Sequence, residues 1–298
     1  RRAGALTART LSAAATVQAR RRRAASRASL TPDLVVVGVL ALLLAAPAAI
    51  HAAGEPEDED EILVAAASDL RFAFDEMAEA FESEHERSVT FSFGSSGLLT
   101  QQIENGAPFD LFFSANRDYI DHLYEGGFAS GEPVVYAIGY LALVAPDGEP
   151  LPEIDELDDE RFEAISIANP SHAPYGLAAQ QAIKSLGLYA DVEDRLVYGD
   201  NVLDAMRLVE SGNADLGLVA LALLDPGEGI DGRRVDKTLH EPIEQTALVL
   251  DRAPLGETED GSLGEAADGP RGEADAFLEF VRSEQGQEIM RRYRFGTP

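Results

Sequence analysis

Serine and asparagine side chains occupy four places where a short apolar run gives way to an amphipathic one. These junctions are Ala67–Ser68, Ser95–Ser96, Asn169–Gly176 and Gly199–Val202. The first N–H groups of a helix have no partner within it, and they attract negative charge. A hydroxyl or amide side chain beside them adds polar contacts, so the four junctions together predict a site for one small anionic ligand.

The candidate donors can be named from their positions in these junctions. Ser68 and Ser96 offer a hydroxyl and a backbone N–H, and Gly97 allows a close approach of the backbone. Pro174 in the first turn of a helix leaves the N–H of Tyr175 free, and an asparagine cap leaves that of Val202 free. Serine and asparagine also cap helices where no ligand binds. The residues alone therefore leave a structural and a ligand-binding interpretation open.

Asp69 is the residue that fits an anion site least well, since a carboxylate repels an oxyanion. We expect its side chain to turn outward and to stabilise the positive end of the helix from solvent. A metal-binding role is not indicated, because nothing around it shows the spacing of a ligand set. Only its backbone N–H is considered as a donor.

Enzymatic readings find little support in the chain. There is no cysteine, which excludes disulfides, zinc thiolate sites and cysteine nucleophiles. The histidines lie in separate segments without metal-ligand spacing, and His172 is interpreted as a loop residue with no catalytic role. A hydrolase with Ser68 or Ser96 as nucleophile remains an alternative, but it needs a histidine and an acid within hydrogen-bond reach.

The charge of the chain is strongly negative, at −29 over 298 residues. Without residues 1–53, which hold eight of the 24 basic residues and one of the 53 acidic ones, 16 basic residues face 52 acidic ones and the charge is −36. This surface argues against nucleic acid or an anionic membrane as a partner. It is typical of a protein from a salty environment, where about 1 M salt screens repulsion within roughly 3 Å.

The first part of the chain has the pattern of an export signal. A basic segment precedes the apolar run 34–50, and small residues follow near Ala53. We interpret residues 1–53 as a cleaved signal peptide with a basic lead, and residues 54–61 as an acidic, flexible leader. A membrane anchor is the alternative, because about 17 apolar residues is borderline for a span. The expected location is the periplasm.

Periodicity predicts alternating strands and helices in the remainder. The expected strands are 62–67, 89–93, 109–114, 165–168, 195–198, 216–221 and 244–250, and the expected helices are 69–84, 97–105, 117–125, 176–186, 202–211 and 274–293. Residues 149–160 and 253–271 are expected to be loops. Extended runs at 134–145 and 240–250 would each cross between two lobes, the first formed by 62–137 with 244–298 and the second by 138–243.

Several of these segments resemble one family of transport proteins. They are AAAS (65–68), GSSGLLTQQIENGAPFDLFFSA (94–115), NPSHAPYG (169–176), DNVLDAMRLVESGNADLGLV (200–219) and MRRYRFG (290–296). The chain is similar through them to the periplasmic molybdate-binding proteins of ABC importers. The resemblance implies an α/β, two-lobed periplasmic-binding-protein (type II) fold, with two mixed sheets flanked by helices and a ligand cleft between the lobes.

The resemblance also implies a function and a site. Molybdate, and with it tungstate, would be captured and passed to a membrane permease by a monomer without catalytic activity or cofactor. Ser68 and Ser96 match the family's hydroxyl donors, and Tyr175 and Val202 match its backbone donors. Some members add a tyrosine hydroxyl where this chain has Ala220, and the Asp69 N–H is the expected substitute. A binding protein for sulfate, phosphate or another tetrahedral oxyanion is the alternative.

Overall fold

The computed structural model describes residues 61–85, 87–129, 131–146, 148–224, 230–251 and 270–298. These residues belong to one compact unit. The predicted signal peptide at 1–53, the leader except Glu61, and nearly all of the loop expected at 253–271 lie outside the described residues. Within the described residues, no helix combines the length and the apolar character that a membrane crossing requires.

Two mixed five-stranded sheets form the framework. The first has the order β2 (Ser88–Gly94), β1 (Glu61–Ala67), β3 (Leu111–Ser114), β10 (Ile243–Val249), β4 (Val134–Gly139). The second has the order β7 (Leu196–Gly199), β6 (Ile165–Ala168), β8 (Leu216–Ala220), β5 (Leu141–Pro146), β9 (Ile230–Arg234). In the first sheet β2, β1 and β3 pair in parallel, and β10 pairs antiparallel with both β3 and β4. In the second sheet β7, β6 and β8 pair in parallel, and β5 pairs antiparallel with both β8 and β9. The predicted two-lobed α/β fold with two mixed sheets is confirmed.

The helices cover both faces of each sheet. Around the first sheet lie α1 (Arg71–Glu82), α2 (Ser96–Glu104), α3 (Arg117–Glu125), α7 (Pro270–Arg282) and α8 (Glu284–Arg292). Around the second lie α4 (Pro174–Ser185), α5 (Tyr189–Val192) and α6 (Val202–Glu210). Short 3-10 turns occupy Ser68–Leu70, Ile154–Glu156, Glu193–Arg195, Leu221–Leu223 and Lys237–Leu239.

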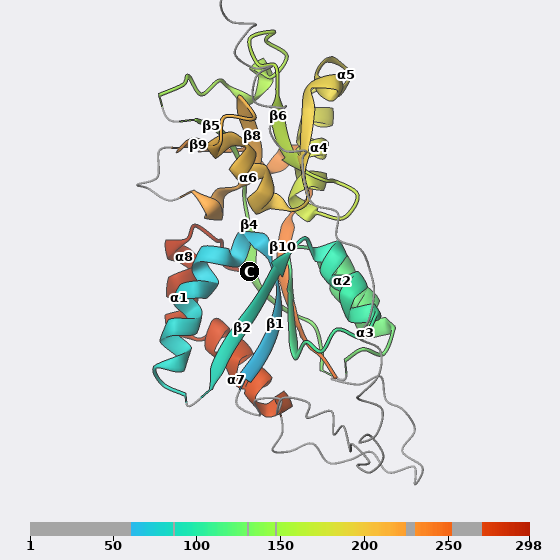
Figure 1. The fold of residues 1–298 in the computed structure, drawn as a ribbon, viewed down its shortest axis with the longest axis vertical. Helices are drawn as coiled ribbons and strands as arrows, with labels where there is room; N and C mark the ends of the chain where they lie inside the picture. The colour runs from blue at the N-terminus through green and yellow to red at the C-terminus, as the bar shows by residue number, and fades with distance from the viewer. Residues whose placement is uncertain (1–60, 86, 130, 147, 225–229, 252–269) are drawn as a thin grey trace, which may run out of the picture. The chain divides into compact units, whose positions relative to one another are not determined.

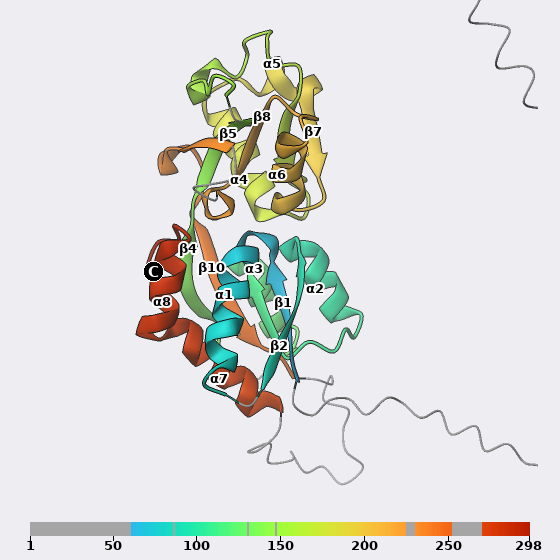
Figure 2. The same ribbon diagram turned by 60° about the vertical axis from the view of Figure 1, so that its left-hand side comes forward.

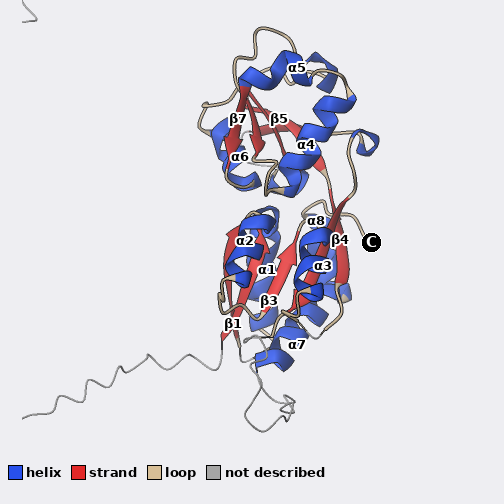
Figure 3. Ribbon diagram, turned by 90° about the vertical axis from the view of Figure 1, so that its right-hand side faces the viewer, coloured by secondary structure: helices blue, strands red, loops and turns tan. Residues whose placement is uncertain are grey.

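Connection handedness explains which face each helix covers. In the first sheet the chain moves outward from β1 to β2 and then back to β3, so right-handed crossovers place α1 and α2 on opposite faces (Figure 1). The same reversal in the second sheet places α4 and α6 on opposite sides of it (Figure 3). The C-terminal helices α7 and α8 pack beside α1, although they lie far away in sequence (Figure 2). In each sheet the reversal creates a point beyond the strand ends where ligands bind in open α/β sheets.

Apolar periodicity accounts for the packing of the first layer of helices. Along α1, the side chains of Phe74, Met77 and Phe81 are buried, with the rings of Phe74 and Phe113 4.8 Å apart at a right angle. Phe277 of α7 meets Phe81 at 5.2 Å in the same edge-to-face manner. These contacts hold α1 against the sheet, and thereby hold the turn that precedes it.

The tertiary structure adds detail to the sequence predictions at three places. The extended run at 134–145 is two strands, β4 and β5, which belong to different sheets and are separated at Tyr140. The strand β9 was not predicted. The last helix divides at Ser283, whose hydroxyl accepts a hydrogen bond from Gly286 N at 3.2 Å and so starts α8 as a new helix.

Candidate functional site

The four sequence junctions converge on one small cavity. Ser68 lies directly beyond β1, Ser95 and Ser96 beyond β2, Tyr175 beyond β6, and Val202 beyond β7. All of these residues line the cavity, as Asp69 does. Its volume is about 10 Å³. The structure therefore brings together all five residues predicted as a site, at the carboxyl ends of the parallel strands.

Both predicted serine hydroxyls are buried and keep their hydrogen available. Ser96 is fully buried, and its Oγ accepts a hydrogen bond from Ala115 N at 3.0 Å. Ser68 is 2% exposed, and its Oγ lies 3.4 Å from Leu203 N. A hydroxyl has one hydrogen to donate and two lone pairs to accept with. Because each Oγ serves here as acceptor, each O–H can still donate to a ligand in the cavity.

The second sheet contributes two helix starts. Pro174 is the first residue of α4, so the N–H of Tyr175 belongs to the first turn and has no partner within the helix. Asn201 caps α6 as expected, accepting hydrogen bonds from Leu203 N at 3.0 Å and Asp204 N at 3.1 Å. Asn201 does not accept from the N–H of Val202, the first residue of α6, so the cap does not use this donor. Both N–H groups carry the positive end of a helix dipole.

The expectation that Asp69 turns outward is wrong. Its side chain is 1% exposed, and its Oδ2 accepts a hydrogen bond from Gln245 Nε2 at 2.6 Å. The 3-10 turn Ser68–Leu70 precedes α1, so Asp69 is not on the solvent-facing first turn of that helix. Burial raises the pKa of Asp69 to about 7, and hydrogen bonds from the Tyr175 hydroxyl, from the backbone N–H of Asp69 itself and from Gln245 oppose that rise.

Two residues behind Asp69 escaped the sequence analysis. Gln245 is fully buried in β10, where it accepts a hydrogen bond from the Tyr136 hydroxyl at 3.3 Å. Burial and, after it, the charge of Asp69 hold the pKa values of Tyr136 and Tyr175 well above their usual range. A glutamine inside the apolar run EQTALVL was the available signal, since a buried polar group needs partners.

The turn before α4 contacts the start of α2 directly. Gly97 N donates to the carbonyl oxygen of His172 at 2.9 Å, and Ser95 Oγ lies 2.8 Å from His172 Nδ1. A Cβ on Gly97 would lie 2.9 Å from that carbonyl oxygen, so glycine at this position permits the close approach of the two turns. These two contacts connect the turn after β2, in the first sheet, to the turn after β6, in the second sheet.

The hydrolase alternative requires a serine, a histidine and an acid in a chain of hydrogen bonds. The serine that meets His172 is Ser95, whereas the proposed nucleophiles Ser68 and Ser96 are bonded to backbone N–H groups. Among the described residues, no carboxylate is hydrogen-bonded to His172. No group of three or more metal-ligating side chains occurs in that part of the chain either.

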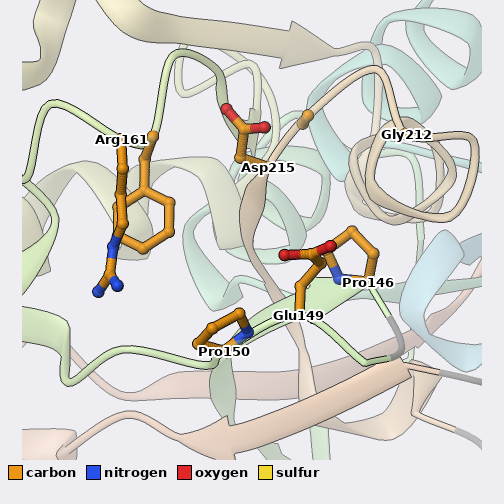
Figure 4. Close-up of a pocket in the computed structure, with 8 residues that line it drawn as sticks. Pro146, Glu149, Pro150, Arg161, Gly212 and Asp215 are labelled. Atoms are coloured by element: carbon orange, nitrogen blue, oxygen red, sulfur yellow. The ribbon is translucent and has the colours of Figure 1, made fainter.

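A larger hollow of about 530 Å³ lies elsewhere, around Pro146, Glu149, Arg161 and Asp215 (Figure 4). It adjoins the beginnings of β6 and β8, and thus the strand ends opposite to the four turns. Asp215 accepts hydrogen bonds from Glu163 N and Ala164 N, and Arg161 pairs with Asp159 at 3.2 Å. The side chains of Asp215 and Arg161 are therefore already paired with other groups of the protein.

Comparison with known proteins gives consistent matches. Residues 62–296 match the family of bacterial extracellular solute-binding proteins. The molybdate-binding protein ModA of Rhodobacter capsulatus is 31% identical over 267 residues, which are 89% of this chain and 98% of the relative. ModA of Azotobacter vinelandii is 33% identical over 241 residues, covering 79% of this chain and 90% of the relative.

Solved structures agree with the sequence matches. The periplasmic molybdate-binding protein of Azotobacter vinelandii superposes with a TM-score of 0.70 at 30% identity, covering 80% of this chain and 99% of that structure. The sulfate-binding protein SubI of Mycobacterium tuberculosis reaches a TM-score of 0.63 at 14% identity, covering 79% of this chain and 86% of that structure. The second likeness shows the fold alone.

Proposed function

Since the chain belongs to the bacterial extracellular solute-binding proteins, which are transport proteins rather than enzymes, we propose that it captures molybdate and delivers it to an ABC permease. Tungstate is the proposed second ligand. The observation that carries the proposal is the convergence of Ser68, Ser96, Tyr175 and Val202 on one buried cavity. Relatives covering most of the chain are molybdate-binding proteins, which favours this oxyanion over others of the same shape.

Neutral donors suffice for a dianion in such a place. Hydrogen bonds to a charged acceptor are roughly twice as strong as those between neutral groups. The hydroxyls of Ser68 and Ser96 and the N–H groups of Tyr175, Val202 and Asp69 would surround the anion. Helix starts add favourable potential where water is excluded. No arginine or lysine among the described residues lines the cavity, so release does not require separation of an ion pair.

The size of the cavity indicates that binding involves movement. A volume of about 10 Å³ is close to the smallest that holds one water molecule. A tetrahedral oxyanion has five heavy atoms, so the turns must separate to admit it. We propose that the lobes, 62–137 with 244–298 and 138–243, open and close about the connections between β4 and β5 and between β9 and β10.

The remaining features of the transport role are part of the same proposal. Residues 1–53 would direct export to the periplasm and be removed, and the mature protein would act as a monomer that docks on the permease. No nucleic acid partner is proposed, in keeping with the net charge of −29.

Isothermal titration of the purified protein in high salt tests the ligand. One-to-one binding of molybdate and tungstate, with no heat from sulfate or phosphate, is the expected result. Tight binding of sulfate or phosphate instead would keep the oxyanion site but replace the ligand. No binding of any of the four anions would overturn the proposal and leave Ser68 and Ser96 as ordinary helix caps.

A further inference from the structure

Asp69 presents an electrostatic problem within the proposed oxyanion site. It lines the same cavity as Ser68 and Ser96 and is 1% exposed, so water does not screen its carboxyl group. An ionised carboxylate and a dianion there would repel each other strongly in a medium of low dielectric constant. Neither lysine nor arginine lines the cavity within the described part of the chain to offset that repulsion.

The hydrogen bonds around Asp69 distinguish its two oxygens. Tyr136, from β4, donates to Gln245 Oε1, which orients the amide so that Nε2 faces Asp69. Nε2 donates to Asp69 Oδ2 at 2.6 Å and lies 3.5 Å from the Tyr175 hydroxyl of α4. Asp69 Oδ1 is buried and has no hydrogen-bond partner in the described structure. Oδ2 therefore accepts a hydrogen bond from Gln245, and a proton on the carboxyl group would be carried by Oδ1.

Among the residues that the structure describes, no titratable group that interacts with Asp69 supplies positive charge. The groups that interact with its charge are the phenols of Tyr136 on β4 and Tyr175 on α4, and β10 contributes the neutral Gln245. His172, in the turn before α4, is paired with Ser95 instead. Burial without a positively charged partner therefore favours the neutral form of Asp69, and the hydrogen bonds from Tyr175 and Gln245 offset that preference only in part.

We infer that Asp69 enters the oxyanion site as a neutral acid, so that each bound oxyanion is accompanied by one proton on Asp69 Oδ1, which donates to the ligand. This inference rests on the proposed function, since it deepens the chemistry of the same site. In the ionised protein, binding must take one proton from solution. No bond other than this O–H forms or breaks, and the dianion keeps its own charge.

The coupling has a defined consequence for affinity. Burial raises the pKa of Asp69 to about 7 in the absence of ligand. Below that value the proton is already present, and the dissociation constant should not depend on pH. Above it the dissociation constant should rise about tenfold for each pH unit, because one proton is bound with each anion.

The test is the dissociation constant of molybdate between pH 6 and pH 9, together with proton uptake at pH 8.5 from titrations in buffers of different ionisation enthalpy. For the unaltered protein we expect the tenfold slope above about pH 7 and uptake of about one proton per molybdate. Asp69→Asn keeps the shape and an acceptor for Gln245 without the charge. It should bind with no pH slope and more tightly than the unaltered protein at pH 9.

Tyr175→Phe supplies a second, directional readout. The Tyr175 hydroxyl stabilises the ionised form of Asp69, so its removal should raise the pKa and move the onset of the slope to higher pH. A flat profile with no proton uptake in the unaltered protein would overturn the inference while leaving molybdate binding intact. The same slope in Asp69→Asn would also overturn it. Absence of molybdate binding at every pH would overturn the proposed function itself.

Discussion

Replacing Asp69 by asparagine should stabilise the ligand-free protein, and increasingly so as pH rises. The pKa of this carboxyl is about 7 in the folded protein, against 3.8 ordinarily. The folded state therefore holds the proton more tightly than the unfolded state does. The free energy of unfolding must fall as pH increases from about 4 to about 7, and it stays low above that range. Asparagine removes this loss, because it is neutral at every pH.

The magnitude follows from the difference between the two pKa values. That difference is about 3 units, and at about 1.4 kcal/mol per unit it amounts to an upper limit of about 4 kcal/mol at pH 8.5. Between pH 5.5 and pH 8.5 the carboxyl passes through its folded pKa, and about 2 kcal/mol of that total should appear. Working above pH 5.5 also avoids the isoelectric point near 4.4.

Urea unfolding of the ligand-free protein at the two pH values measures the effect. The quantity compared is the stability of Asp69→Asn minus that of the unaltered protein, in which the titration of other groups cancels. Asp75→Asn is the matched control, since Asp75 is exposed on α1 and pairs with Arg71 at 3.1 Å. The control should change stability by no more than about 0.5 kcal/mol. If the Asp69→Asn difference is the same at both pH values, Asp69 is not a buried acid with a raised pKa.

Three further perturbations test the site and the surface. Ser96→Ala should weaken molybdate binding by about 1–3 kcal/mol in a titration, and it should also lower stability because Ala115 N loses its acceptor. Gly97→Ala should weaken molybdate binding about tenfold or more, because the Cβ of the new alanine would lie 2.8 Å from the Tyr119 hydroxyl and 2.9 Å from the His172 carbonyl oxygen. Small-angle scattering of this variant with saturating molybdate should show less compaction than in the unaltered protein. Raising salt from about 0.1 to 1 M should raise the urea midpoint, because the net charge of −29 is then screened.

Each of these outcomes has a result that contradicts it. Unchanged affinity in Ser96→Ala would remove Ser96 from the site, and Ser166→Ala, which alters a buried serine bonded to Ala205 O, provides the structural control. Full affinity and full compaction in Gly97→Ala would show that the approach to His172 is not part of the bound state. A urea midpoint that falls with salt would mean that specific ion pairs outweigh general repulsion.

Much of the site was predictable because its backbone donors depend on local features. Pro174 at the start of α4 and Asn201 before α6 are short-range signals, and a helix start leaves its first N–H groups free whatever surrounds it. Ser68 and Ser96 follow apolar strands, and a parallel arrangement brings such strand ends to one edge. The extended runs at 134–145 and 240–250 were expected to cross between lobes, and the chain passes from one sheet to the other between β4 and β5 and between β9 and β10.

The orientation of Asp69 and the contact between Ser95 and His172 depend on residues that lie far apart in the sequence. Asp69 is turned inward by a glutamine 176 positions away, and that glutamine is oriented by Tyr136 on a third strand. The pairing of Ser95 with His172 likewise spans 77 positions and two sheets. Local propensity and charge determine where strands, helices and caps occur in this chain. The ionisation of a buried carboxyl depends on the groups packed around it, and only the tertiary structure brings those groups together.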